Sequence, residues 1–573
     1  MLKPQSYKLP NEPIFHQLLK NSKAIPGVII SDPTCDAYAN YTKLLLDIVV
    51  LRQQLYDALP QSLFDSRGII CPESPYILVA APGNYEFIVA TFTILAIGGA
   101  IIPIAPGVLP EEAVHFLRDS QSSVLLASRP CWERGAAIQA HTASTQGPKV
   151  TVIPISSATW SPNPSRESST TASPTVSIDG TLTIDPSRPS LVLYTSGTTG
   201  LPKGVVQLRP YFSHGYGTST ADLFLTHRPV HWIGGLRSII NLVVSGTPQE
   251  MVEPHEAAIW ERLRVGGVTM LCCVIPMWCR LRQYYLDVLV RLPEEGREEY
   301  LRGARALRVA RVGGAAPMPG LLRFWREKVG LPLEVTYGCT ETGGPGMMTD
   351  RSCDRKLELS LGKPEPGVQV RLSDGNEGEI LIKSSFVFSG YLGAKTTTQT
   401  CFTPDGFFKT GDYGRRVGNE YVIEGRVATD FVRFHGYKIS IVEVETRLAE
   451  LPLVTEACIV SIPDSGASTR VAAVVRFAPN YKQVGNLASI RNALSEHLAE
   501  YKLPTALRVL APHEEIPATV VGKVIRRKVV ERYFVPPGGG DYDAVAPGVE
   551  VWDIGKKSER SVRAWDWAGL QGC

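Results

Sequence analysis

The stretch that decides the fold is TSGTTGLPKG at residues 195–204, which directly follows the apolar run Leu191–Tyr194. Small hydroxylated residues and glycines let backbone N–H groups approach phosphate oxygens closely. The expected phosphate contacts come from Thr195, Ser196, Gly197, Thr198 and Thr199. Lys203 adds a positive charge. A Walker A loop has Gly directly before its Lys, whereas Pro202 stands there in this chain. We therefore predict a strand followed by a phosphate-binding loop of another type.

Strand and helix patterns alternate on the N-terminal side of this loop. Tyr76–Ala81 is an apolar run typical of a strand, residues 84–97 are typical of a buried helix, and Ala100–Ile104 is a second strand. Residues 110–119 then favour a helix and Val124–Ala127 a further strand. This alternation predicts an α/β fold, in which a large layered N-terminal domain contains mainly parallel sheets.

Charge and hydropathy exclude several classes of partner. The formal net charge of +3 over 573 residues, with no Lys/Arg-rich run, gives no reason to expect nucleic acid. The uncharged stretch from Phe87 to Ala105 is long enough to suggest a membrane helix, but Gly98, Gly99 and Pro103 divide it. We therefore expect no membrane span.

The length requires more than one domain, since a single core rarely exceeds 300 residues. We predict a large N-terminal domain over residues 1–425, in which 143–190, rich in Ser, Thr and Pro, form a surface excursion. Residues 426–535 form a small, mobile α+β domain, with strands at Val454–Ile462 and Arg470–Phe477 and a helix at Leu487–Leu498. The tail 536–573 has no clear structural period and is a candidate for disorder.

Five further segments follow the loop in order: GGAAP at 313–317, YGCTE at 337–341, TGD at 410–412, GR at 425–426 and PATVVGK at 517–523. Any one of them could be an ordinary turn. As an ordered set across residues 76–535, they resemble the adenylate-forming superfamily, which contains acyl-CoA synthetases, peptide-synthetase adenylation domains and luciferases.

The resemblance implies an ATP-dependent enzyme with Mg²⁺ and with CoA as acyl acceptor. Gly314, Ala315 and Ala316 would contact adenine, and Tyr337, with Gly338 beside it, would stack on it. Thr340 would contact the α-phosphate, and Glu341 would help to hold Mg²⁺. Asp412 would accept from both ribose hydroxyls, with Arg426 nearby. Lys523 would be the catalytic lysine, and Gly436 would lie on the CoA side.

The small domain of such enzymes swings between the two half-reactions. The junction GRVATDFVRFHGYKIS at 425–440 is one residue longer than the commonest family form, which puts the hinge at Ala428 or Thr429. This departure leaves the expected fold unchanged.

The residue types suit the chemistry that the resemblance implies. A carboxylate and the α-phosphate of ATP are both anions, so attack needs cations that act more strongly as charge spreads over the transferring group. Lys203 and Mg²⁺ would neutralise the departing pyrophosphate, and Lys523 would bridge the acyl oxygen and the α-phosphate. Losing such a charge costs about 3–4 kcal/mol of transition-state stabilisation.

A narrower resemblance concerns the acid. The longer junction, DSQSSVLLAS at 119–128, PGVQVRL at 366–372 and Gly436–Ser440 are similar to the malonyl-CoA synthetase-like branch. This implies malonate or methylmalonate as substrate, whose second carboxylate needs a cation in the acyl pocket. Arg237 and Arg280 are the candidates, and His231 is a candidate gate of that pocket.

Three alternatives remain open at this point. The chain could be a medium-chain fatty acyl-CoA ligase of a biosynthetic pathway, a carrier-protein-directed acyl adenylase, or a non-catalytic protein that retains the fold. The eleven cysteines without C-x-x-C pairs favour a reducing compartment. We expect a cytoplasmic location, with a mitochondrial or peroxisomal one as alternatives.

Overall fold

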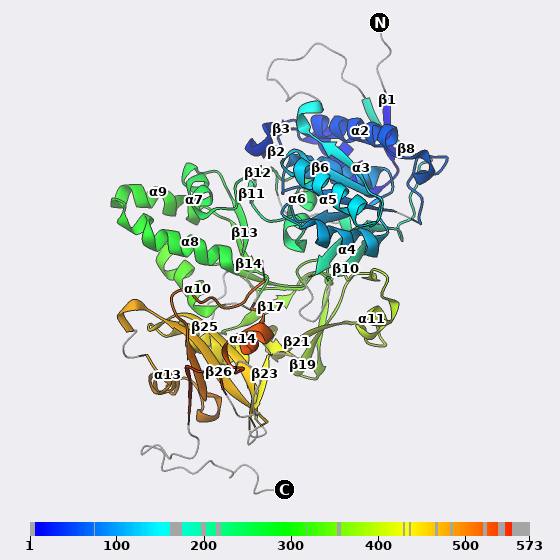
Figure 1. Ribbon diagram of the computed structural model, residues 1–573. Coiled ribbons are helices and arrows are strands. Elements are labelled where there is room, and N and C mark those ends of the chain that lie inside the picture. Colours follow the sequence, from blue (N-terminus) through cyan, green and yellow to red (C-terminus); the bar gives the residue numbers. More distant parts are fainter. Residues whose placement is uncertain are drawn as a thin grey trace.

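The computed structural model of the protein describes residues 6–73, 75–160, 175–195, 202–213, 219–316, 318–351, 357–427, 430–434, 437–464, 468–481, 485–519, 524–536 and 545–552. These residues form three larger sheets and one two-stranded sheet, with helices packed against them (Figure 1). The α/β fold class predicted from the sequence is confirmed.

The first sheet carries the strand that leads into the phosphate loop. Its order is β20 (Gly390–Tyr391), β10 (Lys203–Leu208), β9 (Pro189–Thr195), β5 (Ala100–Ile104), β4 (Tyr76–Ala80), β6 (Val124–Ser128) and β7 (Thr151–Ile155). From β9 to β7 neighbouring strands are parallel, whereas β10 is antiparallel to both β9 and β20. The helices of this part are α1 (Pro13–Ala24), α2 (Tyr41–Ala58), α3 (Tyr85–Ala96), α4 (Pro110–Ser120) and α5 (Trp132–Ser144). The predicted strands and helices of residues 76–127 are confirmed.

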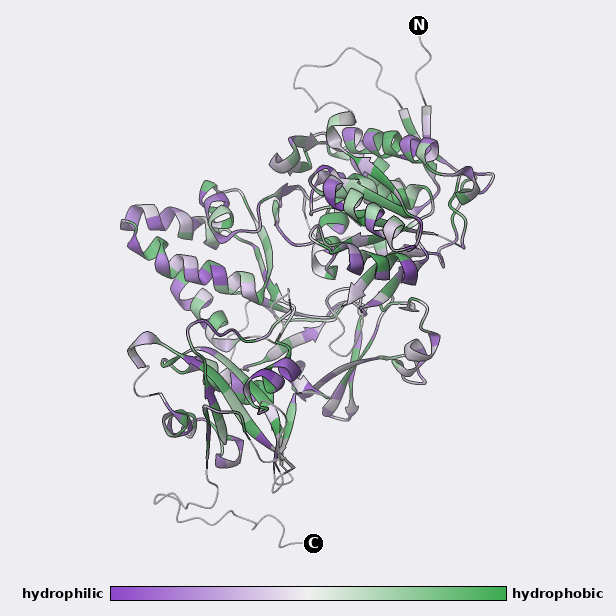
Figure 2. Ribbon diagram, in the orientation of Figure 1, coloured by the Kyte–Doolittle hydropathy of each residue, from purple (hydrophilic) through white to green (hydrophobic). Residues whose placement is uncertain are grey.

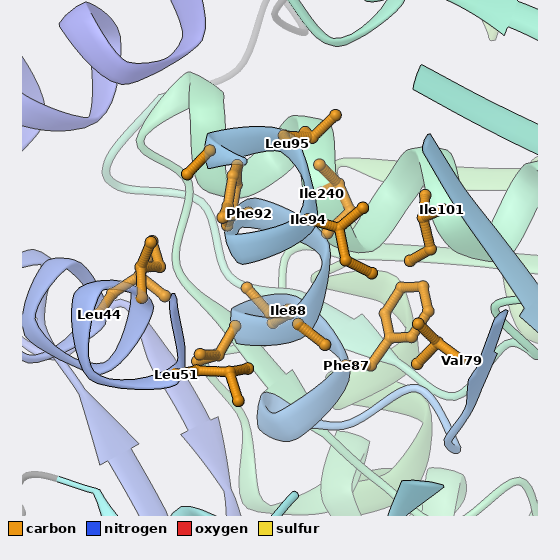
Figure 3. Packing of buried hydrophobic residues seen from close by; sticks show 14 of the residues in the cluster. Leu44, Leu51, Val79, Phe87, Ile88, Phe92, Ile94, Leu95, Ile101 and Ile240 are labelled. Atoms are coloured by element: carbon orange, nitrogen blue, oxygen red, sulfur yellow. The ribbon is translucent and has the colours of Figure 1, made fainter. Parts of the chain in front are cut away.

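Helix α3 is the centre of the largest hydrophobic core. Asn84 caps it by accepting from the N–H of Phe87 (2.9 Å), and every residue from Tyr85 to Ala96 is buried. Figure 3 shows its side chains between Leu44 and Leu51 of α2 on one side and Val79 and Ile101 of the sheet on the other. The helix ends before Gly98, whose φ of +76° suits glycine and turns the chain into β5. Among the described residues, no helix is long and apolar enough to cross a bilayer.

The second sheet joins a parallel half to an antiparallel half. The parallel half contains β15 (Glu334–Tyr337), β14 (Val309–Gly313), β13 (Met270–Val274), β11 (Phe224–Thr226), β12 (Gln249–Met251) and β2 (Ile30–Asp32), with β3 (Ala37–Ala39) antiparallel at its edge. The antiparallel half contains β16 (Met347–Met348), β17 (Ser360–Pro364), β22 (Glu420–Arg426), β21 (Phe408–Val417), β19 (Glu377–Lys383) and β18 (Gln369–Asp374).

Six helices accompany this sheet: α6 (Ile233–Ser245), α7 (Glu256–Val265), α8 (Ile275–Asp287), α9 (Glu294–Arg305), α10 (Pro319–Phe324) and α11 (Lys395–Thr400). Figure 2 shows many hydrophilic residues along α8 and α9, which project outward at the left of the view. The helices of this part pack around stacked tryptophan side chains. The ring centres of Trp260 in α7 and Trp325, directly after α10, are 5.8 Å apart.

The C-terminal part has a sheet of its own. It contains β24 (Tyr437–Ser440), β23 (Phe431–Phe434), β25 (Val454–Asp464), β26 (Ser468–Phe477), β27 (Ala506–Val509) and β28 (Val549–Val551), with helices α12 (Ile441–Glu450), α13 (Leu487–Leu494) and α14 (Arg526–Tyr533). The chain changes sheet between β22 and β23, at the place where we predict the domain boundary. The boundary itself stays a prediction.

Two segments are more ordered than the sequence suggested. Within 143–190, Thr151–Ile155 is an edge strand of the first sheet, because Ile153 and Ile155 are apolar and buried. Thr175–Asp179 forms β8, which pairs in parallel with β1 (Ser6–Pro10). In the tail, β28 pairs with β27, and Trp552 lies 4.3 Å from the guanidinium of Arg491. Thr151–Ile155, Thr175–Asp179 and Val549–Val551 are therefore strands that we did not predict from the sequence. The extents of the surface excursion and of the tail stay predictions.

Candidate functional site

A cavity of about 130 Å³ lies along the parallel half of the second sheet, from the start of β11 and β13 to the carboxyl ends of β14 and β15. Ligands bind at this edge of parallel sheets because the loops that leave the strands meet there. The pairing of β14 with β13 and β15 sets Gly313 beside Val274 and Thr336 at the carboxyl end of the sheet. The lining residues are Phe224, Arg228, Ile233, Gly234, Arg237, Ser238, Leu242, Met270, Cys272, Cys273, Arg311, Gly313, Gly314, Thr336, Tyr337, Gly338, Cys339, Gly344 and Pro345.

Three arginines and no carboxylate line this cavity, within the part of the chain that the structure describes. Arg237 on α6 donates from Nη1 to the carbonyl oxygen of Gly343 (2.8 Å). Arg311 on β14 is paired with Glu334 (3.0 Å between Nε and Oε2). Arg228 precedes α6, and its Nε is buried without a hydrogen-bond partner among the described residues. The cavity is therefore electropositive.

A second cluster joins Tyr337, Asp412 and Arg426 beside the cavity. Asp412 lies opposite Arg426 in the β21–β22 ladder, and Arg426 Nε is 2.8 Å from Asp412 Oδ1. The Tyr337 hydroxyl donates to the other oxygen, Oδ2, at 2.6 Å. Burial and the neighbouring carboxylate raise the pKa of Tyr337 well above its usual range. Burial alone would lower the pKa of Arg426, but Asp412 and its neighbours raise it. Asp412 thus lies between a phenol that donates to it and a guanidinium that pairs with it.

A third cluster connects the end of the phosphate loop with the segment at 337–341. Lys203 pairs with Thr195 where β9 meets β10, and its Nζ lies 5.4 Å from the centre of the Tyr391 ring. The Tyr391 hydroxyl donates to Glu341 Oε1 at 2.8 Å. Tyr391 therefore contacts both the Lys203 ammonium group and the Glu341 carboxylate. No motif pointed to Tyr391, because its position depends on the pairing of β20 with β10.

The structure places most of the predicted nucleotide residues at this edge. Gly314, with a φ of +90°, ends β14, and Ala315 and Ala316 follow it. Tyr337 and Gly338 lie beside them at the end of β15, and the turn that contains Thr340 and Glu341 comes next. A Cβ on Gly338 would clash with the Gly344 carbonyl, so this close approach requires glycine. Ser196, Gly197, Thr198, Thr199, Gly436 and Lys523, and the predicted hinge at 428–429, lie outside the described residues.

The three predicted pocket residues have different positions. Arg237 lines the cavity. Arg280 does not line it, because its guanidinium bonds to the Pro254 carbonyl (2.8 Å) and to Glu256 (3.4 Å) and its side chain is 51% exposed. His231 is also absent from the lining, and burial lowers its pKa to about 4. Arg228 and Arg311 were not predicted as pocket residues, because only the folded chain brings them to the same cavity.

Comparison with known proteins defines the class. The protein family described as "AMP-binding enzyme" matches residues 62–392, and the family described as "AMP-binding enzyme C-terminal domain" matches residues 443–523. The chain belongs to the AMP-binding enzyme family. It is an ATP-dependent, AMP-forming acid–CoA ligase, which uses an acid, ATP and CoA as substrates.

Two relatives indicate where in the family the chain lies. It is 34% identical over 542 residues to the acyl-CoA ligase oryP of Aspergillus oryzae, covering 92% of this chain and 93% of that one. It is 29% identical to a malonate–CoA ligase of Arabidopsis thaliana, covering 79% and 77%. The fold is similar to ATP-bound MatB from Rhodopseudomonas palustris, with a TM-score of 0.72, 21% identity and coverage of 90% and 98%.

Proposed function

We propose that this acyl-CoA ligase activates a short dicarboxylic acid, such as malonate or methylmalonate. The observation that carries the proposal is the arginine-lined cavity without a carboxylate in its described lining. A second carboxylate in such a cavity gains charge-assisted hydrogen bonds that a fatty acid cannot make.

The position of the cavity supports the same reading. It reaches Gly314, Tyr337 and Gly338, which we assign to the adenine contacts. An acid in the cavity would therefore have its reacting carboxylate beside the α-phosphate of a bound ATP. Thr340, in the turn after Gly338, is the residue we assign to that phosphate.

We assign Asp412 and Arg426 to the ribose. The Asp412 carboxylate is fixed by Tyr337 and Arg426, so its remaining lone pairs have a defined direction. A carboxylate is an acceptor only, which matches two ribose hydroxyls that each have a hydrogen to donate.

Glu341 is the residue we assign to Mg²⁺. Magnesium prefers oxygen ligands and is usually held by one or two carboxylates together with substrate phosphates. The chain fits this pattern, since no cluster of three or more His, Cys, Asp or Glu that could hold a metal occurs in the part that the structure describes. The Tyr391 hydroxyl orients the Glu341 carboxylate through Oε1. When bound, the ion would screen the negative charge of the phosphates.

The reaction joins these parts. One carboxylate oxygen attacks the α-phosphorus, the bond to the pyrophosphate breaks, and an acyl-adenylate remains; the CoA thiolate then attacks the acyl carbon and AMP leaves. Lys203 would stabilise the leaving pyrophosphate, and Lys523 would stabilise the charge between the acyl oxygen and the α-phosphate. We expect the small domain to move between the two steps.

A medium-chain fatty acid and a carrier-protein acceptor are the alternatives. The test is pyrophosphate release by the purified enzyme with malonate, methylmalonate, butyrate and octanoate, each with and without CoA. We expect malonate or methylmalonate to give the highest kcat/KM and CoA to be required for thioester formation. A preference for butyrate or octanoate would refute the dicarboxylate proposal.

We place the enzyme in the cytoplasm. The nine cysteines in the described ranges are all free, which suits a reducing compartment. Relatives from mouse and human carry "mitochondrial" in their names, so a matrix location is the competing outcome. Fractionation of cells that express the tagged protein distinguishes the two.

A further inference from the structure

Arg228 differs from the other cations of the cavity. It stands between β11 and α6 and lines the cavity. Its Nε is buried without a hydrogen-bond partner among the described residues. A buried N–H without a hydrogen-bond partner is unfavourable, so this atom indicates that a ligand oxygen accepts from it when the cavity is filled.

The other two arginines already have protein partners. Arg311 is neutralised by Glu334 at 3.0 Å. Arg237 donates to the Gly343 carbonyl at 2.8 Å, and its guanidinium lies 5.2 Å from the centre of the Phe386 ring. A ligand would have to compete with these contacts to engage either side chain in full. A ligand could bind the Nε–H of Arg228 without displacing a protein partner of that atom.

Gly234 makes room for Arg228. It lies in the first turn of α6, and a Cβ built on it would collide with both Nη2 and Cζ of Arg228. Gly234 has no positive φ, so its backbone does not need glycine. The missing side chain instead gives the guanidinium its place against the helix, inside the cavity.

We propose that Arg228, seated on Gly234, is the specificity-determining residue that binds the anionic group at the far end of the acid. This inference rests on the proposed function, and it names the residue that selects the substrate. Arg237 then shapes the same cavity, while Arg280 lies outside it, bonded to Glu256 and Pro254.

The test compares malonate with butyrate, which lacks the second carboxylate. In Arg228→Met we expect kcat/KM for malonate to fall at least tenfold, mainly through KM, while butyrate stays within about twofold, because loss of one partner of a buried charge pair is costly. Arg228→Lys should recover part of the malonate activity. The matched control is Arg264→Met, an arginine of α7 paired with Glu261 on the surface, which should leave the malonate to butyrate ratio unchanged.

Gly234→Ala is an independent arm that keeps the arginine. Its methyl group would displace the guanidinium, so we expect the same loss of malonate preference as in Arg228→Met. The double variant should be no worse than Arg228→Met alone, because both changes remove one interaction. If Arg228→Met does not fold, Gly234→Ala decides.

The outcomes separate the two claims. An unchanged malonate to butyrate ratio in both Arg228→Met and Gly234→Ala overturns the role of Arg228, whichever other arginine changes that ratio. A wild-type preference for butyrate instead overturns the proposed substrate class, and the inference with it.

Discussion

Asparagine at position 412 would remove the charge that holds three groups of the proposed ribose site together. In the protein, Asp412 accepts from the Tyr337 hydroxyl at 2.6 Å and pairs with Arg426 at 2.8 Å. The Asp412 side chain is 9% exposed and that of Arg426 is 44% exposed. Water can therefore replace the carboxylate more readily at Arg426 than at the part-buried hydrogen bond with Tyr337.

The expected magnitude follows from this difference. Hydrogen bonds to charged groups contribute about 1.5–3 kcal/mol. Since solvent compensates part of the loss at Arg426, we expect Asp412→Asn to lower the free energy of unfolding by about 2 kcal/mol. The loss of a charged acceptor for the ribose should weaken ATP binding by the same 1.5–3 kcal/mol, which is about 10- to 150-fold.

Calorimetric titration with ATP and urea unfolding measure the two effects. The matched control is Asp405→Asn, because Asp405 pairs with Arg371 at 2.8 Å but both side chains are about half exposed, at 52% and 46%. We expect that control to change stability by less than about 1 kcal/mol. Tyr337→Phe keeps the ring and removes the donor, so it should couple with Asp412→Asn by at least about 1 kcal/mol. Additive effects, or unchanged ATP affinity in a folded Asp412→Asn protein, would refute the reasoning.

Two further predictions concern the catalytic lysine and acid stability. Lys523→Ala should nearly abolish acyl-adenylate formation yet largely spare transfer from a supplied acyl-adenylate to CoA; equal loss in both half-reactions, assayed separately, would contradict the assignment. Burial lowers the pKa of His227 from 6.5 to about 4, so the unfolded chain takes up a proton that the folded chain rejects between these pH values. Stability should therefore fall by about 3 kcal/mol as pH drops through this window. His227→Gln should reduce this dependence in urea unfolding, whereas His255→Gln, at an exposed residue, should retain it.

Local patterns predicted the elements that depend on local sequence. The uncharged stretch 87–105 was divided correctly because Gly98 has a φ that only glycine adopts easily, and because residues 85–96 form a helix that is buried on every face. The edge strand at 151–155 was missed, since a short run beside Ser- and Thr-rich sequence gives a weak signal. β28 was missed for a related reason, because its pairing with β27 joins residues 41 to 45 positions apart in the chain.

The candidate site likewise contains residues that the sequence predicts and residues that it does not. This difference explains why Arg228 was overlooked. Tyr337, Asp412 and Arg426 belong to short motifs whose spacing can be read directly, and the ladder between β21 and β22 brings two of them together. A pocket cation has no such motif, because any arginine near the right strand end qualifies until its partners are known. Arg280 fits the sequence argument as well as Arg228 does. The difference is that Glu256 neutralises Arg280, whereas the guanidinium of Arg228 has no described ion-pair partner and lies over a glycine. The selection of the substrate that we propose thus depends on a charge without a described ion-pair partner, which a sequence pattern cannot display.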